Sequence, residues 1–434
     1  MVEQMKPSGI DSIGDIPTNW IVKPMKYLVE FYNGDRSEDY PSRNEFVPDG
    51  IPFINAGHLL NGTLDFESLD YISEEKYKSM GGVKLLKNDI IYCLRGSLGK
   101  NAFLNIDKGT VASSLVAIRS KDICPKYLFY IINSHIEEAQ RSLWDNGTAQ
   151  PNLSADNLGK FYICVPPVKE QNIIVTFLDN ECTKIDGIIS DLEKQIETLQ
   201  KYRKSLILET VTKGLNKNAS MKPSGIDWIG DIPAHWDINK IKYLFSIVNG
   251  STPESNDLNC WDGDIRWITP ADMEDFGEIA FGERNLTTFG YDSCGTSLLP
   301  IGSIVISTRA PIGKINITTN VLCTNQGCKS LVGNKYNKYF YYLLYVLKDQ
   351  LTLLGRGTTF LELSTSALAN FKIIIPKDEE QICIVNYLDS QCEKIDSILK
   401  DKQEQLEKIK QHKKSLIYEY VTGKKRVKEA INGN

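Results

Sequence analysis

The sequence predicts an α+β protein with two globular α/β domains in a pseudo-two-fold arrangement, separated by two long antiparallel coiled-coil helices. Three observations predict this fold. One frame of residues occurs twice in the 434-residue chain. Two stripes of apolar residues with heptad spacing lie at equivalent places in the two copies. Short β-like runs and helical stretches fill the residues before each stripe, which is the pattern of an α+β domain.

The duplicated frame begins with Met5–Asp11, which returns as Met221–Asp227, and a Trp follows each copy. The similarity then fades and resumes before each stripe, where Lys184–Asp186 matches Lys394–Asp396. Solenoid repeats have periods of roughly 20–50 residues, so a repeat this long indicates duplication of a whole domain. Because the middle of each copy has diverged, we expect two similar frames that carry two different surfaces.

The apolar stripes predict two long helices, at 167–214 and 377–423, and gaps of three and four residues favour helices that pair with each other. The residues predicted to form the pairing seam are Leu178, Ile185, Leu192, Leu199, Leu388, Ile395, Leu406 and Ile409. Arg203 and Lys413 interrupt the stripes, and charges at such positions fix register and partner choice. Asp378 with Gln381 resembles a capping box at the start of the second helix. The alternative is two separate helices, each packed on its own domain.

The globular domains are expected at 1–166 and 215–376, and a basic tail at 424–434. The β-like runs are Ile51–Ile54, Ile90–Leu94 and Val111–Ile118 in the first copy, and Ile265–Ile268, Ile304–Ser307 and Gly327–Val332 in the second. A helical stretch follows in each copy, at Lys126–Ile132 and Tyr339–Leu347.

Basic residues and glycines follow one predicted strand in each domain. The candidates for DNA contact there are Arg95, Ser97 and Lys100 in the first copy and Arg309 and Lys314 in the second. Arg and Lys supply charge for phosphate, and glycines let the backbone approach it. Further candidates lie in polar turns: Asn146 and Thr148, their counterparts Arg356 and Thr358, and the amides Asn325 and Gln326, which could bond adenine. The alternative for all of them is an ordinary exposed hairpin or turn whose polar groups bond locally.

Composition limits the classes of function. The net charge of −5 argues against a general polyanion binder, so affinity for nucleic acid must come from local basic patches or from partners. No apolar run reaches the roughly 18 residues of a membrane span, and the start lacks a signal-peptide pattern, so we expect a cytoplasmic protein with no membrane contact. Ten cysteines without a C-x-x-C pair favour buried thiols over a metal site.

Familiar catalytic motifs are absent from the sequence. There is no G-x-x-x-x-G-K-[ST] loop, no glycine-rich dinucleotide loop and no Asn-Pro-Pro-Tyr tetrapeptide. The four histidines have no counterparts in the other copy. We therefore predict no catalytic residue and no metal ligand, although a nuclease site built from scattered acids stays open.

The segment M-K-P-S-G-I-D-W-I-G-D-I-P-x-x-W at 221–236, with its first copy at 5–20, resembles the opening of target recognition domains in specificity subunits of type I restriction–modification systems. The two long helical stretches resemble the helices of that family. The resemblance implies two target recognition domains and a non-catalytic subunit that reads a bipartite, asymmetric site in double-stranded DNA. It also implies two DNA adenine methyltransferase (M) subunits and two ATP-driven motor-nuclease (R) subunits as partners. S-adenosylmethionine, ATP and Mg would belong to those partners, and this chain would hold no cofactor.

Two other classes of function stay open. The chain could be a standalone DNA nuclease or methyltransferase with an unrecognised site, which would show turnover by itself. It could also be a coiled-coil scaffold that binds proteins only, which would show no sequence-dependent retention of DNA.

Overall fold

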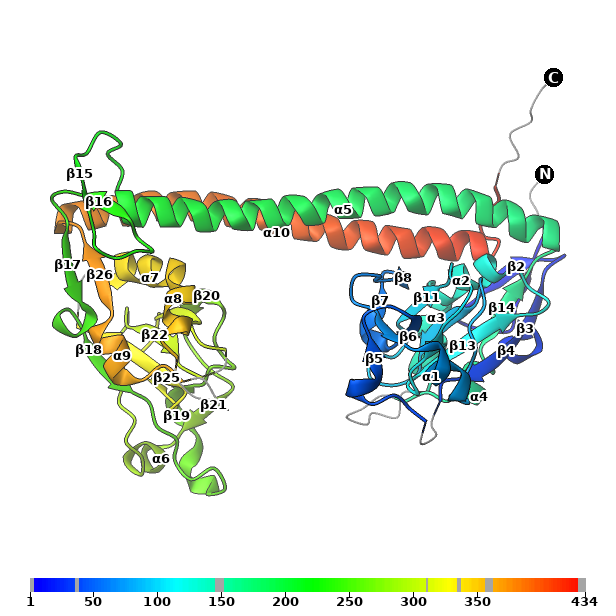
Figure 1. Ribbon diagram of the computed structural model, residues 1–434, viewed down its shortest axis with the longest axis horizontal. Coiled ribbons are helices and arrows are strands. Elements are labelled where there is room, and N and C mark those ends of the chain that lie inside the picture. Colours follow the sequence, from blue (N-terminus) through cyan, green and yellow to red (C-terminus); the bar gives the residue numbers. More distant parts are fainter. Residues whose placement is uncertain are drawn as a thin grey trace. The chain divides into compact units, whose positions relative to one another are not determined.

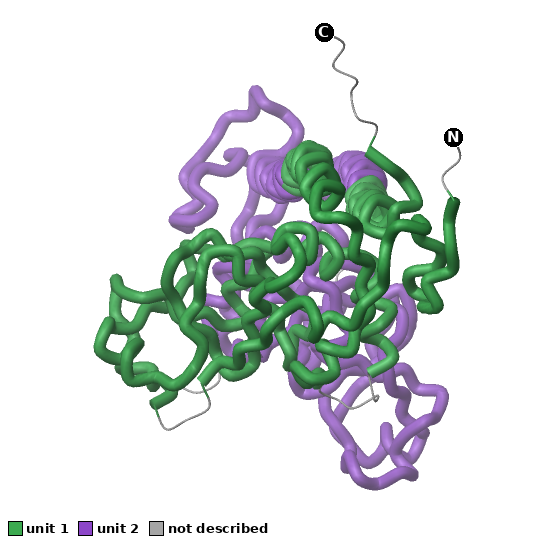
Figure 2. The backbone as a smooth tube through the Cα atoms, turned by 90° about the vertical axis from the view of Figure 1, so that its right-hand side faces the viewer, with its two compact units in different colours: residues 1–193, 404–434 green, residues 194–403 purple. Residues whose placement is uncertain are grey.

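A computed structural model describes residues 4–35, 39–144, 152–309, 311–333, 337–355 and 362–427. The chain forms two compact units (Figure 2). Unit 1 contains residues 1–193 and 404–434, and unit 2 contains residues 194–403. Two long helices, α5 (Val168–Lys213) and α10 (Asp378–Val421), each contribute one segment to unit 1 and one to unit 2. Among the described residues, no helix has both the length and the apolar character needed to cross a membrane.

Unit 1 combines small sheets with short helices (Figure 1). Its strands are β1 (Met5–Pro7), β2 (Asp15–Pro17), β3 (Ile21–Pro24), β4 (Val29–Asn33), β5 (Phe46–Val47), β6 (Ile51–Ile54), β7 (Leu59–Leu60), β8 (Thr63–Leu64), β9 (Asp70–Ile72), β10 (Ile90–Cys93), β11 (Asn101–Phe103), β12 (Thr110–Val111), β13 (Leu115–Ser120) and β14 (Tyr162–Val165). Its short helices are α1 (Glu74–Ser79), α2 (Pro125–Ile132), α3 (His135–Ser142) and α4 (Ala155–Leu158).

The sheets of unit 1 bury their apolar residues on both faces. One sheet has the order β11-β10-β13-β4, and a second has the order β12-β6-β9-β5. In the first sheet Tyr92 of β10 lies opposite Val116 of β13, and both side chains are buried. The core on one side of this sheet includes α2, the first turns of α5, and Ile417 and Val421 at the end of α10. The unit therefore needs both long helices to complete its core.

Unit 2 repeats this architecture with different strands. Its strands are β15 (Met221–Pro223), β16 (Asp231–Pro233), β17 (Asp237–Lys240), β18 (Ser246–Asn249), β19 (Trp261–Ile268), β20 (Phe276–Ile279), β21 (Arg284–Leu286), β22 (Ile304–Ser307), β23 (Ile315–Thr318), β24 (Cys323–Thr324), β25 (Cys328–Val332) and β26 (Lys372–Ile375). Its short helices are α6 (Thr288–Asp292), α7 (Asn337–Val346), α8 (Lys348–Leu353) and α9 (Thr365–Asn370).

The main sheet of unit 2 has the order β18-β25-β22-β23-β20, and a smaller sheet has the order β21-β19-β24. Strand β20 pairs in parallel with β23 at the edge of the main sheet. In unit 1 the corresponding strand β11 has only an isolated bridge from Gly62 to Ala102 at that edge. Ile207 and Val211 of α5 join the core of unit 2, as Ile417 and Val421 of α10 join the core of unit 1.

Within each unit, segments of α5 and α10 lie side by side in antiparallel orientation. In unit 1, Lys413 Nζ lies 2.6 Å from Asp186 Oδ1 and Lys410 Nζ lies 3.1 Å from Glu193 Oε1. In unit 2, Arg203 Nη2 lies 3.1 Å from Asp396 Oδ2. In unit 2, Lys402 Nζ also donates to Gln195 Oε1 at 2.6 Å. In each unit residue numbers therefore fall along α10 as they rise along α5, which confirms the predicted antiparallel pairing within each unit.

Several residues that the two copies share bond the globular part of a unit to the long helices. The fully buried Trp20 donates from Nε1 to Glu170 at the start of α5 (3.0 Å), and Trp236 donates in the same way to Glu380 at the start of α10 (2.9 Å). Tyr127 donates from its hydroxyl to the Val421 carbonyl at the end of α10, at 2.9 Å. Tyr339 makes the matching bond to Val211 in unit 2. Local hydrogen bonding and packing therefore explain why much of the frame has survived.

The predicted capping box at Asp378 is wrong. Asp378 is the first residue of α10, so its side chain is not in the N-cap position. Gln381 Nε2 donates instead to the carbonyl oxygen of Pro376 (2.8 Å), and Gln171 Nε2 makes the matching bond to Pro166 (2.9 Å). Both helices thus start with the same buried glutamine.

The fold confirms the predicted α+β class. Helices α5 and α10 lie inside the predicted ranges 167–214 and 377–423. Strands β6, β10, β13, β19, β22 and β25 and helices α2 and α7 overlap the predicted runs, although the predicted run Val111–Ile118 is divided between β12 and β13. The predicted tail at 424–434 is described as far as Val427, and within it Lys424 Nζ donates to the Ile13 carbonyl.

Candidate nucleic-acid interface

The basic turn of unit 1 connects β10 to β11 and carries Arg95, Ser97 and Lys100, all of which are exposed. Gly99 ends the turn at φ +85°, a conformation that favours glycine. An added Cβ at Gly99 would also meet Arg141 Nε at 3.0 Å. Gly99 N donates to the Cys93 carbonyl, so this amide already has a partner in the hairpin. The hairpin itself therefore requires glycine at this position, whether or not the turn binds a phosphate.

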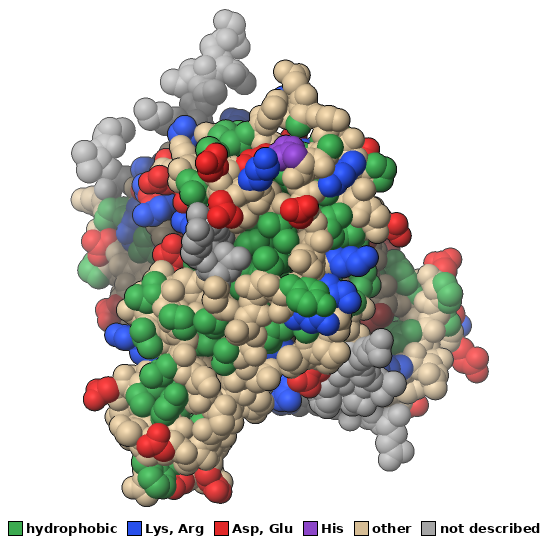
Figure 3. Space-filling view, turned by 90° about the vertical axis from the view of Figure 1, so that its left-hand side faces the viewer, with side chains coloured by type: hydrophobic (Ala, Val, Ile, Leu, Met, Phe, Trp, Pro, Cys, Tyr) green, Lys and Arg blue, Asp and Glu red, His purple; other side chains and the backbone are tan. Residues whose placement is uncertain are grey.

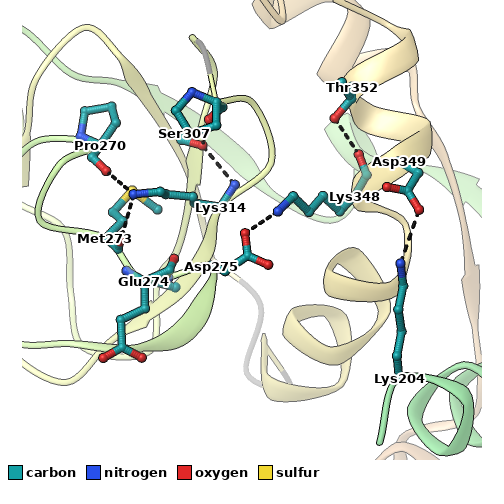
Figure 4. Close-up of polar contacts among 12 residues, drawn as sticks. Lys204, Pro270, Met273, Glu274, Asp275, Ser307, Lys314, Lys348, Asp349 and Thr352 are labelled. Carbon is teal, nitrogen blue, oxygen red and sulfur yellow. Dashed lines mark hydrogen bonds and ion pairs between the residues drawn. The ribbon is translucent and has the colours of Figure 1, made fainter. Parts of the chain in front are cut away.

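The lysines at the ends of the two basic turns hold a neighbouring loop. Lys100 Nζ donates to the Ala56 carbonyl (3.2 Å) and remains exposed. Lys314 Nζ is half-buried and donates to two carbonyls, those of Pro270 (2.8 Å) and Met273 (2.7 Å), as Figure 4 shows. Lys100 can turn toward a phosphate by giving up one exposed bond, whereas Lys314 would have to give up two.

The arginines of the two turns differ in their electrostatic surroundings. Arg95 Nε donates to the neutral amide of Asn152 (3.2 Å), whereas Arg309 Nε lies 3.4 Å from the carboxylate of Glu362. Glu362 also lies 3.9 Å from Lys329, whose pKa is lowered because burial outweighs the attraction of this carboxylate. Arg95 therefore presents a net positive charge, while Arg309 belongs to a partly neutralised cluster.

The predicted amide pair lies between β24 and β25 of unit 2. Asn325 Oδ1 accepts from the Gly327 backbone N–H (2.9 Å), which is a local turn bond. Gln326 is exposed, and its Oε1 accepts from the Thr252 hydroxyl. Base contact by these two residues stays a prediction, and Gln326 is the better placed of them.

The remaining predicted DNA-contact residues lie outside the described residues. They are Asn146, Thr148, Arg356 and Thr358. The seam residues are all described: Leu178, Ile185, Leu192, Leu388 and Ile395 are buried, and Leu199, Leu406 and Ile409 are half-buried. Leu178 and Leu388 belong to the globular cores as well as to the helix stripes.

A buried carboxylate in unit 1 has the shifted pKa that is typical of catalytic groups. Burial raises the pKa of Glu137, which accepts from the Tyr92 hydroxyl and pairs with Arg141 Nε at 2.8 Å. The Glu137 side chain is only 5% exposed, so a substrate cannot reach it, and its contacts fasten α3 to β10. Among the described residues, no group of three or more His, Cys, Asp and Glu side chains is placed to hold a metal ion.

Sequence reasoning missed one pair of exposed residues. Lys26 and Tyr27 of unit 1 match Lys242 and Tyr243 of unit 2, and all four side chains are exposed. The duplicated frame could have identified these residues. A residue that both copies share but that does not pack inward must be kept for a reason other than the core.

Comparisons with known proteins identify the same protein family in both copies. The model of the type I restriction modification DNA specificity domain matches residues 17–198 and again residues 233–408. The type I restriction enzyme MjaVIII specificity subunit of Methanocaldococcus jannaschii is 26% identical over 433 residues, covering 95% of this chain and 94% of that protein. The MjaIX specificity subunit of the same organism is 37% identical over 190 residues, covering 42% of this chain and 43% of that protein.

A solved chain has the same fold. It comes from a study of complex assembly and conformational transition of the type I R-M system. Its TM-score is 0.66 at 17% identity, covering 94% of this chain and 99% of that chain. The duplicated frame, the paired helices and the two domain matches lead to one conclusion: this chain belongs to the family of proteins built from the type I restriction modification DNA specificity domain.

Proposed function

We propose that this chain is the DNA sequence-specificity subunit of a type I restriction–modification complex and that it does no chemistry by itself. The observation that carries this proposal is the family domain, which matches twice around the same pair of helices. Relatives that bear the name of specificity subunit match along nearly the whole of both chains. The ligand is double-stranded DNA, and the compartment is the cytoplasm, where that DNA lies.

The two units read different half-sites of one bipartite, asymmetric DNA sequence. Their shared frame supports a common way of binding DNA, and their structural differences support different recognition sequences. Arg95 has a neutral neighbour where Arg309 has a carboxylate, and β20 pairs along a sheet edge where unit 1 has the isolated bridge from Gly62 to Ala102. Sequence-specific recognition depends on the few side chains that reach base edges, so such differences change the DNA sequence that is recognised.

The long helices hold the interval between the two half-sites. Helix α5 runs without a break from residues of unit 1 into residues of unit 2, and α10 runs back. A continuous helix has a fixed rise of about 1.5 Å per residue, so its length is set by its sequence. The paired carboxylates and cations on α5 and α10 stabilise one register of the pair.

The outer faces of the helices dock two DNA adenine methyltransferase subunits. Lys184, Ile188 and Asp191 lie at helical spacing on an exposed face of α5. Their counterparts on α10, Lys394, Ile398 and Asp401, are identical and also exposed. Ile188 is 48% exposed and Ile398 is 45% exposed, so packing within the chain does not explain them. One surface present twice suits two copies of one partner.

The partners supply the chemistry. S-adenosylmethionine binds the methyltransferase subunits, and ATP and Mg²⁺ bind the motor-nuclease subunits that join for restriction. Two rival functions predict different results. A standalone nuclease or methyltransferase would turn over DNA without partners, and a protein-only scaffold would leave the methyltransferase without sequence preference.

Methylome sequencing tests the proposal. The chain is co-expressed with its adenine methyltransferase in a host that lacks other adenine methylation, and methylated adenines are mapped with long reads. We expect one bipartite sequence with two unlike parts and a gap of constant length. Methylation without a common sequence, or methylation by either protein alone, would contradict the proposal.

The docking surface has a matched control. Ile188→Asp with Ile398→Asp should leave the fold intact and abolish co-elution with the methyltransferase, because both side chains are exposed. Ile21→Asp introduces the same change at an exposed position where the second copy already has Asp237, so it should have no effect. If the double variant still co-elutes in full, the docking surface lies elsewhere.

A further inference from the structure

A residue that survives in two diverged copies usually packs inside, bonds locally or touches something outside the chain. Lys26 and Tyr27 match Lys242 and Tyr243, and among the described residues neither burial nor a side-chain hydrogen bond explains them. Tyr27 is 63% exposed and Tyr243 is 67% exposed. By contrast Lys6, another shared lysine, donates to the Thr18 carbonyl at 2.8 Å.

The backbone presents these residues in the same way in both units. They lie on short 3₁₀ helices, η1 (Met25–Tyr27) and η4 (Ile241–Tyr243), whose first residues are buried. Met25 N donates to the Phe161 carbonyl (2.8 Å), and Ile241 N donates to the Phe371 carbonyl (3.0 Å). The turn thus fixes residue 25 or 241 inward, which directs the following Lys and Tyr outward.

Lysine and tyrosine act as one composite surface. Lys26 Nζ lies 5.1 Å from the centre of the Tyr27 ring, and Lys242 Nζ lies 5.2 Å from the centre of the Tyr243 ring. This cation–π arrangement keeps an ammonium group close to the ring that carries the phenol hydroxyl. The repeated geometry means that the two units offer the same donors to a ligand.

A second lysine accompanies each pair, although from a different position in the sequence. In unit 1 it is Lys160, which lines a surface pocket of about 360 Å³ together with Lys26, Trp144 and Tyr162. In unit 2 the residue that matches Lys160 is Asn370, and Lys240 Nζ lies 3.3 Å from Asn370 Oδ1. The positive charge has therefore been kept at this place while its residue has changed.

Basic side chains are enriched on the face of unit 2 that carries η4. Figure 3 shows Lys and Arg side chains gathered beside apolar ones at the level of strands β17 and β26. Strand β17 carries Lys240, which lies opposite Lys372 of β26, and η4 directly follows β17. For a chain with a net charge of −5, three neighbouring lysines on β17, η4 and β26, one of them 5.2 Å from the ring centre of the exposed Tyr243, are a selective feature.

We propose that Lys26–Tyr27 and Lys242–Tyr243 are matching, sequence-independent contacts to the phosphodiester backbone of DNA. The inference rests on the proposed function and adds the residues that position the duplex on each unit. Lys and Tyr are common donors to phosphate oxygens, and such contacts set register without carrying sequence information. The two units recognise different DNA sequences. Residues that both units share are therefore suited to backbone contact and unsuited to base recognition.

The test uses the full chain in complex with its methyltransferase. Lys26→Ala and Lys242→Ala are made singly and together, and binding is measured against salt for a duplex with the methylated sequence and for an unrelated duplex of equal length. We expect the same fold-loss of affinity on both duplexes. The slope of log K against log salt should become shallower by about 0.9 for each lysine removed. The methylated sequence should stay unchanged.

Lys78→Ala is the control, because Lys78 is an exposed lysine elsewhere on unit 1. Three results would overturn the inference: a salt slope equal to that of the control, a loss confined to the methylated sequence, or loss of the methyltransferase from the complex. The last result would assign the surface to a protein partner. Failure of the proposed function is a separate result, because the unaltered complex would then show no preference between the two duplexes.

Discussion

Arg203 and Lys413 occupy equivalent positions on the apolar stripes, and each faces an equivalent carboxylate, Asp396 and Asp186. The sequence predicts that charges interrupt the stripes, but it does not identify their partners. The reason is physical: the partners are far apart in the chain and meet only because the helices pair antiparallel in one register. Two reciprocal ion pairs then favour that register over its neighbours.

Removing the carboxylate from one of these pairs should loosen the helices locally. Asp396→Ala leaves Arg203 half-buried without its ionised partner, which should cost about 1–2 kcal/mol. Amide hydrogen exchange in the adjoining turns of α5 and α10 should then be about five to thirty times faster. Glu181→Ala removes the half-buried partner of the exposed Lys184 and should change local stability by less than about 0.5 kcal/mol. Equal exchange rates in the two variants would contradict this account.

Buried thiols should make the protein sensitive to alkali. Burial raises the pKa of Cys164 from 9.0 to about 12 and that of Cys328 also to about 12. Above pH 9 the unfolded chain loses these protons while the folded chain keeps them, so the free energy of unfolding falls as pH rises. Below pH 9 the contribution is complete. Each such thiol should lower stability by about 1.4 kcal/mol per pH unit above 9.

Urea denaturation between pH 7 and pH 10.5 measures this effect. Cys164→Ala should be less stable at pH 7, because it loses buried contacts, and should show a shallower decline above pH 9. An identical decline in both proteins would show that Cys164 does not titrate in this way.

The candidate site shows what sequence can predict at the scale of single residues. It locates the basic turns, because Arg and Gly-Lys stand after a strand in both copies. It does not reveal that Lys314 Nζ donates to two neighbouring carbonyls, since Pro270 and Met273 approach it only through the fold. It also does not separate Lys26 from Lys6, because only the structure shows which shared lysine has a local bond.

At the scale of elements, the sequence predicts the helices and strands that have a regular apolar periodicity. It does not predict the short strands that pair irregularly. The heptad stripes locate α5 and α10, and runs such as Ile304–Ser307 locate buried strands. Strands β1, β2 and β3 each end in proline, which removes a donor from the ladder and hides them from propensity rules. Strand β3 pairs with β14 from the far end of the domain, a contact that no local pattern reports.

Lengthening both helices should lengthen the gap in the DNA sequence. Seven residues inserted after Ile189 and seven after Leu399 preserve the heptad pattern and add about 10.5 Å to each helix. At about 3.4 Å per base pair the gap should grow by about three base pairs, with both half-sites unchanged. Methylome sequencing of the variant gives the gap directly. A gap of the original length would show that the helices do not set the interval.

At the scale of the whole molecule, the chain separates what the two units share from what distinguishes them. The shared parts are Trp20 and Trp236, Tyr127 and Tyr339, and the helix segments that they hold. The unlike parts are the sheet edges and the charges around the basic turns. Duplication followed by divergence of the second set gives one chain with two DNA specificity domains on a common frame, and under the proposed function each domain has its own specificity.

Exchange of one domain tests this independence most directly. Residues 1–166 are replaced by the corresponding domain of another family member, and adenine methylation is mapped in a host that expresses the hybrid with the methyltransferase. We expect that one half-site changes while the other half-site and the gap stay the same. A change in both half-sites, or in neither, would contradict the claim that each unit reads its own part of the DNA.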